Sequence, residues 1–295
     1  MAKSKYTYKD SRFFRLRSKK KLAELLFVTQ QKLQNTANME DRYFEFQKPK
    51  KNGEMRNISA PVKPLKEIQS RISDLLKRIA APEYLFAPVQ GRSYADNAVC
   101  HLGAKAVHLL DIDDFFPNCT INKAIWFFRT KMECSPDVSA ILARIVTNDG
   151  SLPQGSPCSP ILAYLCYMDM WDEISELVKQ YNCKLSVYAD DLTISGDKVP
   201  GKLAWEIKKL LVKHGHQFAK NKEKAIFNKP VEITGVIIGP KGATVPNRQF
   251  KKIVETRYAL LRTKHIPTKV ALEHQLHGRL AQAKQIQDAE AKQKN

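Results

Sequence analysis

The stretch Leu185-Ser186-Val187-Tyr188-Ala189-Asp190-Asp191-Leu192-Thr193-Ile194-Ser195 decides the fold. Two short runs of β-forming residues flank Tyr-Ala-Asp-Asp, so we expect a β-hairpin with two adjacent carboxylates at its tip. Such carboxylates repel each other unless a cation lies between them, and oxygen ligands suit a hard divalent metal. The tetrapeptide alone does not decide the function, because Tyr94-Ala95-Asp96-Asn97 nearly repeats it without a hairpin pattern.

A second acidic cluster follows the apolar run over residues 106–112, which reads as a strand. Asp111 comes directly after the apolar residues, so it is placed to project from the strand end, whereas Asp113 and Asp114 are better explained as turn residues. Three carboxylates from two neighbouring strands can hold two Mg²⁺ ions that activate a hydroxyl and steady a leaving pyrophosphate.

The charge of the chain is concentrated at its two ends. The formal net charge is +19; residues 1–30 carry nine Lys or Arg against two acids, and residues 201–295 carry twenty against seven. The body between them is almost neutral. This distribution suits a polyanion such as nucleic acid held across a metal centre, although a solvated surface is the simpler explanation of most charge runs.

The remaining composition indicates a globular protein. No apolar run approaches the roughly 20 residues that a membrane span needs, and the N-terminus has no apolar signal segment. The six cysteines form no Cys-x-x-Cys pair, which argues against structural zinc. We therefore expect a cytoplasmic, reduced protein without a membrane partner.

The residue pattern predicts an α+β fold. We expect a basic arm leading into a helix near residues 20–28, a hairpin over 43–58 that turns at Lys51-Asn52-Gly53, and a strand over 106–112. Helical spacing or capping residues predict helices over 65–79, from Asp96 or Asn97, over 121–132, 136–147 and 159–180, and around 203–211. Strands are expected over 225–227 and 232–238, a turn at 240–242 and a basic helical region over 247–290, whose last fifteen residues are expected to fray or to await a partner.

Three motifs in order make this chain resemble a reverse transcriptase. They are Asp111 five residues before the aromatic Phe116, then Leu152-Pro153-Gln154-Gly155-Ser156-Pro157, then the Tyr-Ala-Asp-Asp stretch. The likeness covers about residues 43–240. It implies a right-hand polymerase fold, with fingers and an antiparallel palm sheet over 41–240, a basic N-terminal arm and helix over 1–40, and a helical, basic thumb over 241–295.

The resemblance also implies roles for individual residues. Asp111, Asp190 and Asp191 would be the catalytic and metal-binding triad, with two Mg²⁺ ions as the cofactor. The dNTP would contact Arg56 through its triphosphate, Phe116 beneath its sugar, and Gln154 and Gly155 at the base pair. Lys50 or Lys51 could assist at the triphosphate. Lys224 would reach the leaving pyrophosphate, with Lys220 and Lys222 as alternatives.

Two further patterns resemble retron reverse transcriptases. Asn97-Ala98-Val99-Cys100-His101 fits the Asn-Ala-x-x-His signature, and Ile233-Thr234-Gly235 is similar to the Val-Thr-Gly triplet. On residues alone, Asn97 could be a helix cap and His101 a buried, satisfied histidine. The RNA-binding residues that we expect are Asn97, His101, Arg248, Lys251, Lys252, Arg257 and Arg262, with Lys264 and Tyr258 beside them.

The retron resemblance implies RNA-directed DNA synthesis on a dedicated structured non-coding RNA. Priming from a 2′-hydroxyl would give branched RNA-linked DNA (msDNA), in a system of antiviral defence with an effector protein encoded nearby. Two alternatives stay open. One is an RNA-binding scaffold that holds an effector inactive, with secondary or no polymerase activity. The other is a different bacterial reverse transcriptase, of the diversity-generating, standalone defence or group II-like type.

Overall fold

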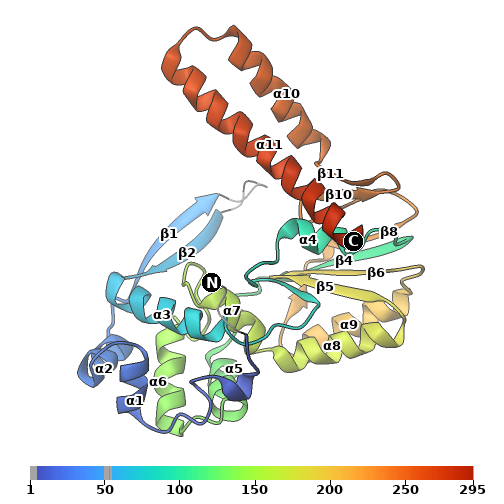
Figure 1. Cartoon of the computed structure of the whole chain (residues 1–295). Coiled ribbons are helices and arrows are strands. Elements are labelled where there is room, and N and C mark those ends of the chain that lie inside the picture. Colours follow the sequence, from blue (N-terminus) through green and yellow to red (C-terminus); the bar gives the residue numbers. More distant parts are fainter. Residues whose placement is uncertain (1–4, 50–52, 54, 295) are drawn as a thin grey trace. The chain divides into compact units, whose positions relative to one another are not determined.

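A computed structural model describes residues 5–49, 53 and 55–294 of the chain (Figure 1). The chain divides into two compact units. The first combines residues 1–82, 112–174 and 208–218, and the second combines residues 83–111, 175–207 and 219–295. No helix among the described residues is both long enough and apolar enough to span a membrane.

The first unit is mainly helical. Its elements are η1 (Tyr8–Asp10), α1 (Lys19–Leu25), α2 (Gln30–Asn38), β1 (Tyr43–Pro49), β2 (Met55–Pro61), α3 (Lys63–Leu76), α5 (Ile121–Trp126), the π-helical η2 (Phe127–Lys131), α6 (Pro136–Val146), α7 (Ser159–Leu165) and β7 (Gln217–Phe218). The helix expected over 65–79 is α3, whose Leu65, Ile68 and Ile72 are fully buried. The expected hairpin is β1 paired antiparallel with β2. The Lys51-Asn52 part of its turn, and Lys50, lie outside the described residues.

The second unit is built on a sheet in the order β3-β5-β6-β4, with β8 also paired to β4. It contains β3 (Leu85–Ala87), α4 (Tyr94–Val99), β5 (Lys184–Tyr188), β6 (Asp191–Gly196), η3 (Lys220–Lys222), β8 (Lys224–Phe227), β9 (Val231–Ile233), β10 (Val236–Gly239), β11 (Gly242–Thr244), α10 (Asn247–Arg262) and α11 (Ile266–Lys294). Three elements, β4 (Ala106–Asp113), α8 (Met168–Gln180) and α9 (Gly201–Lys213), have residues in both units. The sheet is antiparallel except for the parallel pair β3–β5.

Two expected elements are divided in the structure. The helix expected over 159–180 is broken after α7, where the backbone N–H of Tyr167 donates to the Tyr164 carbonyl only three residues back and the buried Tyr167 hydroxyl donates to the Asn118 carbonyl. The strand expected over 232–238 is a hairpin of β9 and β10, because Thr234 and Gly235 both adopt positive φ, of 45° and 86°. Such a pair of residues makes a tight two-residue turn.

The C-terminal residues are helical rather than frayed. Helix α11 runs antiparallel to α10 and reaches Lys294 (Figure 1). Its last turns are anchored by Ile286 and Ala289, which are 1% and 4% exposed and pack in a core with residues of α4 and β9–β11. In addition, the Glu290 carboxylate accepts the Ala243 backbone N–H at 2.9 Å. These contacts hold the last turns of α11 against the rest of the second unit.

Candidate active site

The predicted carboxylate hairpin is present and closes tightly. Strands β5 and β6 pair up to Tyr188 and Asp191, which leaves Ala189 and Asp190 as the two-residue loop. Ala189 adopts a φ of 58°, a left-handed conformation that costs a non-glycine residue about 1 kcal/mol. The loop therefore places Asp190 at the tip and Asp191 at the first position of β6.

The third carboxylate lies on the neighbouring strand. β4 pairs antiparallel with β6, and Asp111 is directly opposite Asp191 in the register. Opposed residues of an antiparallel pair have Cα atoms roughly 4.5–5.5 Å apart, and Asp190 is one residue, about 3.8 Å, further along. All three carboxylates therefore lie well within a nanometre, as a shared metal centre requires.

The carboxylates strongly perturb one another. Desolvation of its carboxyl, followed by the charges of Asp190 and Asp111, raises the pKa of Asp191 to about 7. A hydrogen bond between the Asp111 and Asp191 side chains contributes in the same direction. Near neutral pH the three carboxylates therefore repel one another, and a bound cation would reduce this repulsion.

One cation of the protein is already at this cluster. Lys222 Nζ lies 2.7 Å from Asp111 Oδ1, and Lys222 belongs to η3, which the Ala219 N–H holds to β4 by donating to the Asp111 carbonyl at 2.9 Å. Burial opposes the charge, but the hydrogen bond to Asp111 and the three carboxylate charges raise the pKa of Lys222. Lys224, which sequence reasoning favoured, is exposed on β8 opposite Leu109.

The donor set fits a hard divalent cation. As the side chains stand, no three His, Cys, Asp or Glu residues in the described part of the chain are arranged to hold a metal ion. One Asp111 oxygen is bound to Lys222 instead. Three converging carboxylates, one with a pKa near 7, nevertheless present the oxygen-only ligands that Mg²⁺ prefers, together with uncompensated charge.

The residues expected to contact the dNTP lie in the first unit. Gly155 has a φ of 124°, and a Cβ there would lie 2.8 Å from the Ser59 carbonyl oxygen, so only glycine fits. The Gln154 carbonyl accepts the Ser59 N–H at 2.7 Å, which ties this loop to β2. Arg56 is exposed on the same strand.

Phe116 is half-buried and rests on a support of buried rings. Its ring centroid is 5.7 Å from that of Phe115, which is 4% exposed and in turn touches the rings of Trp171 and His216. Phe116 thus keeps one face accessible on a rigid base, as a residue that packs beneath a sugar requires. Its role stays a prediction.

The two groups of predicted RNA-binding residues differ in exposure. The side chains that crowd α10 and the following turn are exposed: Arg248, Lys251, Lys252, Arg257, Arg262 and Lys264, with Tyr258 among them. Arg248 pairs with Glu232, and Lys251 lies 3.8 Å from Glu255. Asn97 and His101, in contrast, are each only 1% exposed and bind protein groups. Direct RNA contact needs accessible polar atoms, and the structure buries these two.

Comparison with known proteins agrees with this geometry. Residues 48–238 match the family model described as reverse transcriptase (RNA-dependent DNA polymerase). The retron Se72 reverse transcriptase of Salmonella heidelberg is 35% identical over 149 residues, which are 50% of this chain and 39% of the relative. The retron Ec86 reverse transcriptase of Escherichia coli is 25% identical over 222 residues, 74% of this chain and 69% of the relative.

A third relative, the retron Mx65 reverse transcriptase of Myxococcus xanthus, is 30% identical over 175 residues, 53% of this chain and 41% of that protein. The chain thus spans less than two thirds of the length of the Salmonella and Myxococcus relatives. The resemblance to retron reverse transcriptases is confirmed. Since the family model covers well over half of its residues, the chain belongs to the reverse transcriptase family.

Proposed function

We propose that this chain is an RNA-directed DNA polymerase with fingers and palm over 41–240, a basic arm over 1–40 and a helical thumb over 241–295. The observation that carries the proposal is the β4–β6 register, which sets Asp111 opposite Asp191 and beside Asp190. Folding alone gives no reason to gather three carboxylates, because like charges at this spacing oppose it. A metal-dependent reaction does.

Asp111, Asp190 and Asp191 would hold two Mg²⁺ ions. The bound ions would assist attack of a primer hydroxyl on the dNTP and stabilise the charge of the leaving pyrophosphate. Lys222 holds a proton at Nζ beside Asp111 and supplies positive charge to the same centre. Since it touches the triad in this structure, we favour Lys222 over Lys224 as the lysine that acts on the pyrophosphate.

The first unit would select the nucleotide. Phe116, fixed by Phe115, would exclude a 2′-hydroxyl and so favour dNTPs. Arg56 can grip a triphosphate through its paired donors, and Gln154 and Gly155 would shape the pocket at the base pair. These assignments rest on the motif order and on the exposure of each group.

We further propose a retron function. The three relatives named above are retron reverse transcriptases, and the exposed basic face of α10 suits structured RNA, which is recognised through phosphates, shape and 2′-hydroxyls. The product would be branched RNA-linked DNA primed from a 2′-hydroxyl of a dedicated non-coding RNA. The system would act against phage with an effector protein encoded nearby. Six unpaired cysteines suit the cytoplasm.

The test is incorporation of labelled dNTPs on a primed RNA template. Asp190→Ala with Asp191→Ala should abolish synthesis while RNA binding persists. Asp197→Ala is the matched control, because this aspartate is on the same hairpin and its side chain is 84% exposed. Retained synthesis in the double variant would refute the metal assignment.

The retron reading has its own test. Nucleic acid that co-purifies with the protein from its native host should contain a 2′–5′ branch. Unbranched DNA would indicate another class of bacterial reverse transcriptase. A wild-type protein that binds RNA but incorporates no dNTP would indicate a scaffold.

A further inference from the structure

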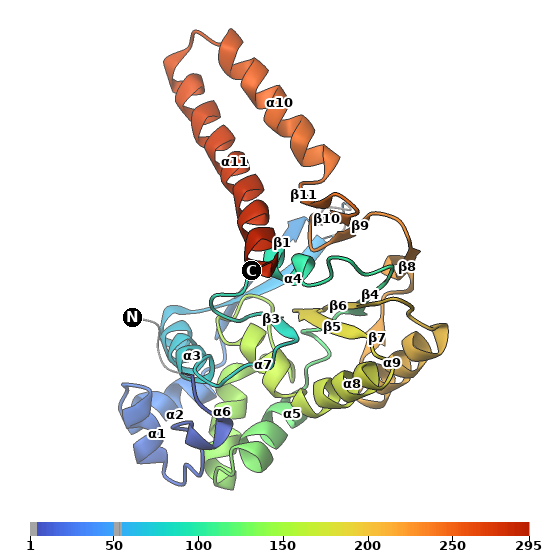
Figure 2. The ribbon, with the colours of Figure 1, turned by 45° about the vertical axis from the view of Figure 1, so that its right-hand side comes forward.

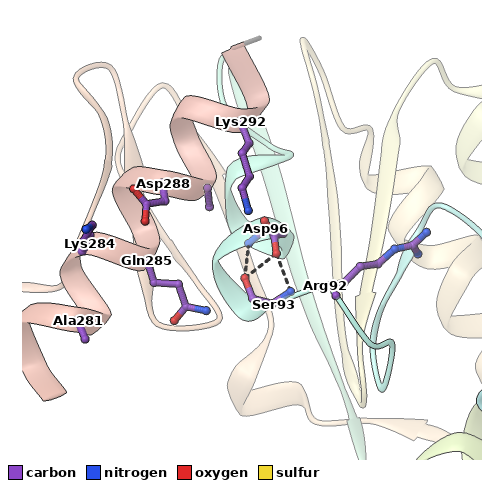
Figure 3. A pocket seen from close by; sticks show the side chains of 10 residues that line it. Arg92, Ser93, Asp96, Ala281, Lys284, Gln285, Asp288 and Lys292 are labelled. Atoms are coloured by element: carbon purple, nitrogen blue, oxygen red, sulfur yellow. Dashed lines mark hydrogen bonds between the residues drawn. The ribbon is translucent and has the colours of Figure 1, made fainter. Parts of the chain in front are cut away.

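Helix α4 and the turn after it connect the carboxylate hairpin to the C-terminal part of the second unit. The helix is only six residues long, but a capping box fixes its start: the Ser93 hydroxyl accepts the Asp96 N–H, and the Asp96 carboxylate accepts the Ser93 N–H at 2.7 Å (Figure 3). It contacts α11, β3, β5 and β10 (Figure 2). A shift of α4 would therefore change its packing against all four elements.

Asn97 holds the turn between β9 and β10. Its Nδ2 donates to Thr234 Oγ1 at 3.3 Å, and that hydroxyl donates to the Tyr94 carbonyl at 2.9 Å. Thr234 has a φ of 45°, unfavourable for a β-branched residue. The two hydrogen bonds to α4 offset this strain and define where the β9–β10 hairpin lies on the helix.

His101 holds the carboxylate hairpin itself. Its Nδ1 lies 2.6 Å from Ser195 Oγ on β6, and its Nε2 lies 2.7 Å from Ser186 Oγ on β5. The two serines are 2% and 0% exposed. Burial lowers the pKa of His101 to about 3, so the ring is neutral and one nitrogen donates while the other accepts. The imidazole is thus a bridge between β5 and β6, the two strands whose connecting loop contains Asp190 and leads into Asp191.

We propose that Asn97 and His101 are positioning residues that fix the carboxylate hairpin and the β9–β10 turn to one short helix, and that neither touches RNA. The proposal rests on the proposed polymerase function for its catalytic readout. Its physical basis is local: small displacements of catalytic groups are costly, on the order of a hundredfold in rate per ångström. A ring that binds both strands at once restrains such displacements.

The geometry gives Asn97 and His101 separate partners within the protein. Asn97 lies in the last turn of α4 and His101 in the turn that follows the helix. Asn97 binds Thr234, and His101 binds the two serines. A contact to RNA would leave Ser186 and Ser195 buried without partners. That loss is expensive in a closed interior.

The decisive variant is His101→Phe, which keeps a ring but removes both hydrogen bonds. We expect kcat on a generic primed RNA template to fall by about ten- to a hundredfold and the half-saturating Mg²⁺ concentration to rise. RNA affinity should change less than about twofold, because no RNA contact is lost. Should His101→Phe fail to fold, Ser195→Ala removes one hydrogen bond with the ring intact and should show the same pattern more weakly.

Two controls separate positioning from stability and from RNA binding. Ile207→Val, a buried change on α9, should cost about 1 kcal/mol of stability without moving the Mg²⁺ dependence. Arg257→Ala, an exposed change on α10, should lower RNA affinity and leave the Mg²⁺ dependence unchanged. If His101→Phe behaves like either control, the proposal is overturned.

Amide hydrogen exchange tests the proposal without any activity. His101→Phe should speed exchange in the hairpin over 185–195 more than in the β9–β10 turn, and Asn97→Ala or Thr234→Val should do the reverse. Equal acceleration everywhere would mean ordinary core packing and would refute the positioning roles. An inactive wild-type protein with the expected exchange pattern would refute the polymerase function alone.

Discussion

Replacing Asp191 by asparagine should stabilise the metal-free protein at neutral and alkaline pH. The folded protein holds the Asp191 proton up to a pKa of about 7, whereas the unfolded chain releases it near the ordinary aspartate pKa of 3.8. Between these values the folded state binds more protons than the unfolded state, so stability falls as the pH rises. This loss of folding stability is absent below about pH 4 and complete above about pH 7. It does not occur in Asp191→Asn, which has no carboxyl to ionise.

The size of the effect follows from the shift and the exposure. A shift from 3.8 to about 7 would correspond to about 4 kcal/mol in a sealed site. Although the Asp191 carboxyl is partly desolvated by its neighbours, the residue as a whole is exposed to solvent, and solvent screening reduces such terms to about 1 kcal/mol. For a chain of this length, we expect a gain of about 2 °C in Tm.

The assay is thermal unfolding in EDTA at pH 8 and again at pH 4. The difference in Tm between Asp191→Asn and wild type should be positive at pH 8 and close to zero at pH 4. Added Mg²⁺ should raise the Tm of the wild type more than that of the variant, since ligands stabilise the state that binds them. Asp197→Asn is the matched control because it changes an exposed aspartate directly after β6, which pairs with Lys105.

A variant that is equal to or less stable than wild type at pH 8 in EDTA would refute this reasoning. It would mean that Lys222 already neutralises the whole cluster, and that the three carboxylates do not need a metal. An equal gain for Asp197→Asn would also refute it, because the effect would then reflect net charge.

Three further outcomes follow from the structure. Gly155→Ala should lose about 1–3 kcal/mol of stability and raise the KM for dNTP, since its Cβ would meet the Ser59 carbonyl. Gly278→Ala, at an open position on α11, should instead gain up to about 1 kcal/mol of stability. Melting curves and the KM for dNTP test both variants. Phe116→Ala should raise ribonucleotide incorporation; unchanged sugar selectivity in single-nucleotide assays would demote it to packing. Arg257→Ala should reduce the slope of log affinity against log salt by about one; a flat salt response of the wild type would remove RNA binding from α10.

The carboxylate hairpin and its neighbouring strand were predictable because their sequence carries local signals. Residues 106–112 and 185–195 are short β-forming runs bounded by acids, and the observed β4, β5 and β6 match them to within a residue or two. Their pairing followed from the motif order, since acids meant for one metal must end on adjacent strands. The proximity of Asp111, Asp190 and Asp191 was therefore predictable from the sequence, and their role as metal ligands stays a prediction.

Other boundaries depend on contacts that the local pattern does not contain. Thr234 gives no turn signal of its own, and its positive φ is held by hydrogen bonds from Asn97 and to Tyr94, about 140 residues away. The start expected at Asp96 or Asn97 lies at Ser93, where the capping box was readable in Ser93-x-x-Asp96 but was overlooked. The start of α4 at Ser93 was thus a missed local signal, whereas the turn at Thr234 depends on tertiary contacts.

In the candidate site too, the sequence identified the residues but not the groups that they contact. The sequence left Lys220, Lys222 and Lys224 as alternatives, because spacing along a chain does not show which side chain reaches the acids. The short η3 turn, held to β4 through the Ala219 N–H, brings Lys222 to Asp111. Likewise, a motif match marked His101 without its function. In the structure, both ring nitrogens of His101 form hydrogen bonds with buried serines that are 85 and 94 residues away in the sequence. Motif residues near a catalytic centre should therefore be assigned to a ligand only after their buried partners are known.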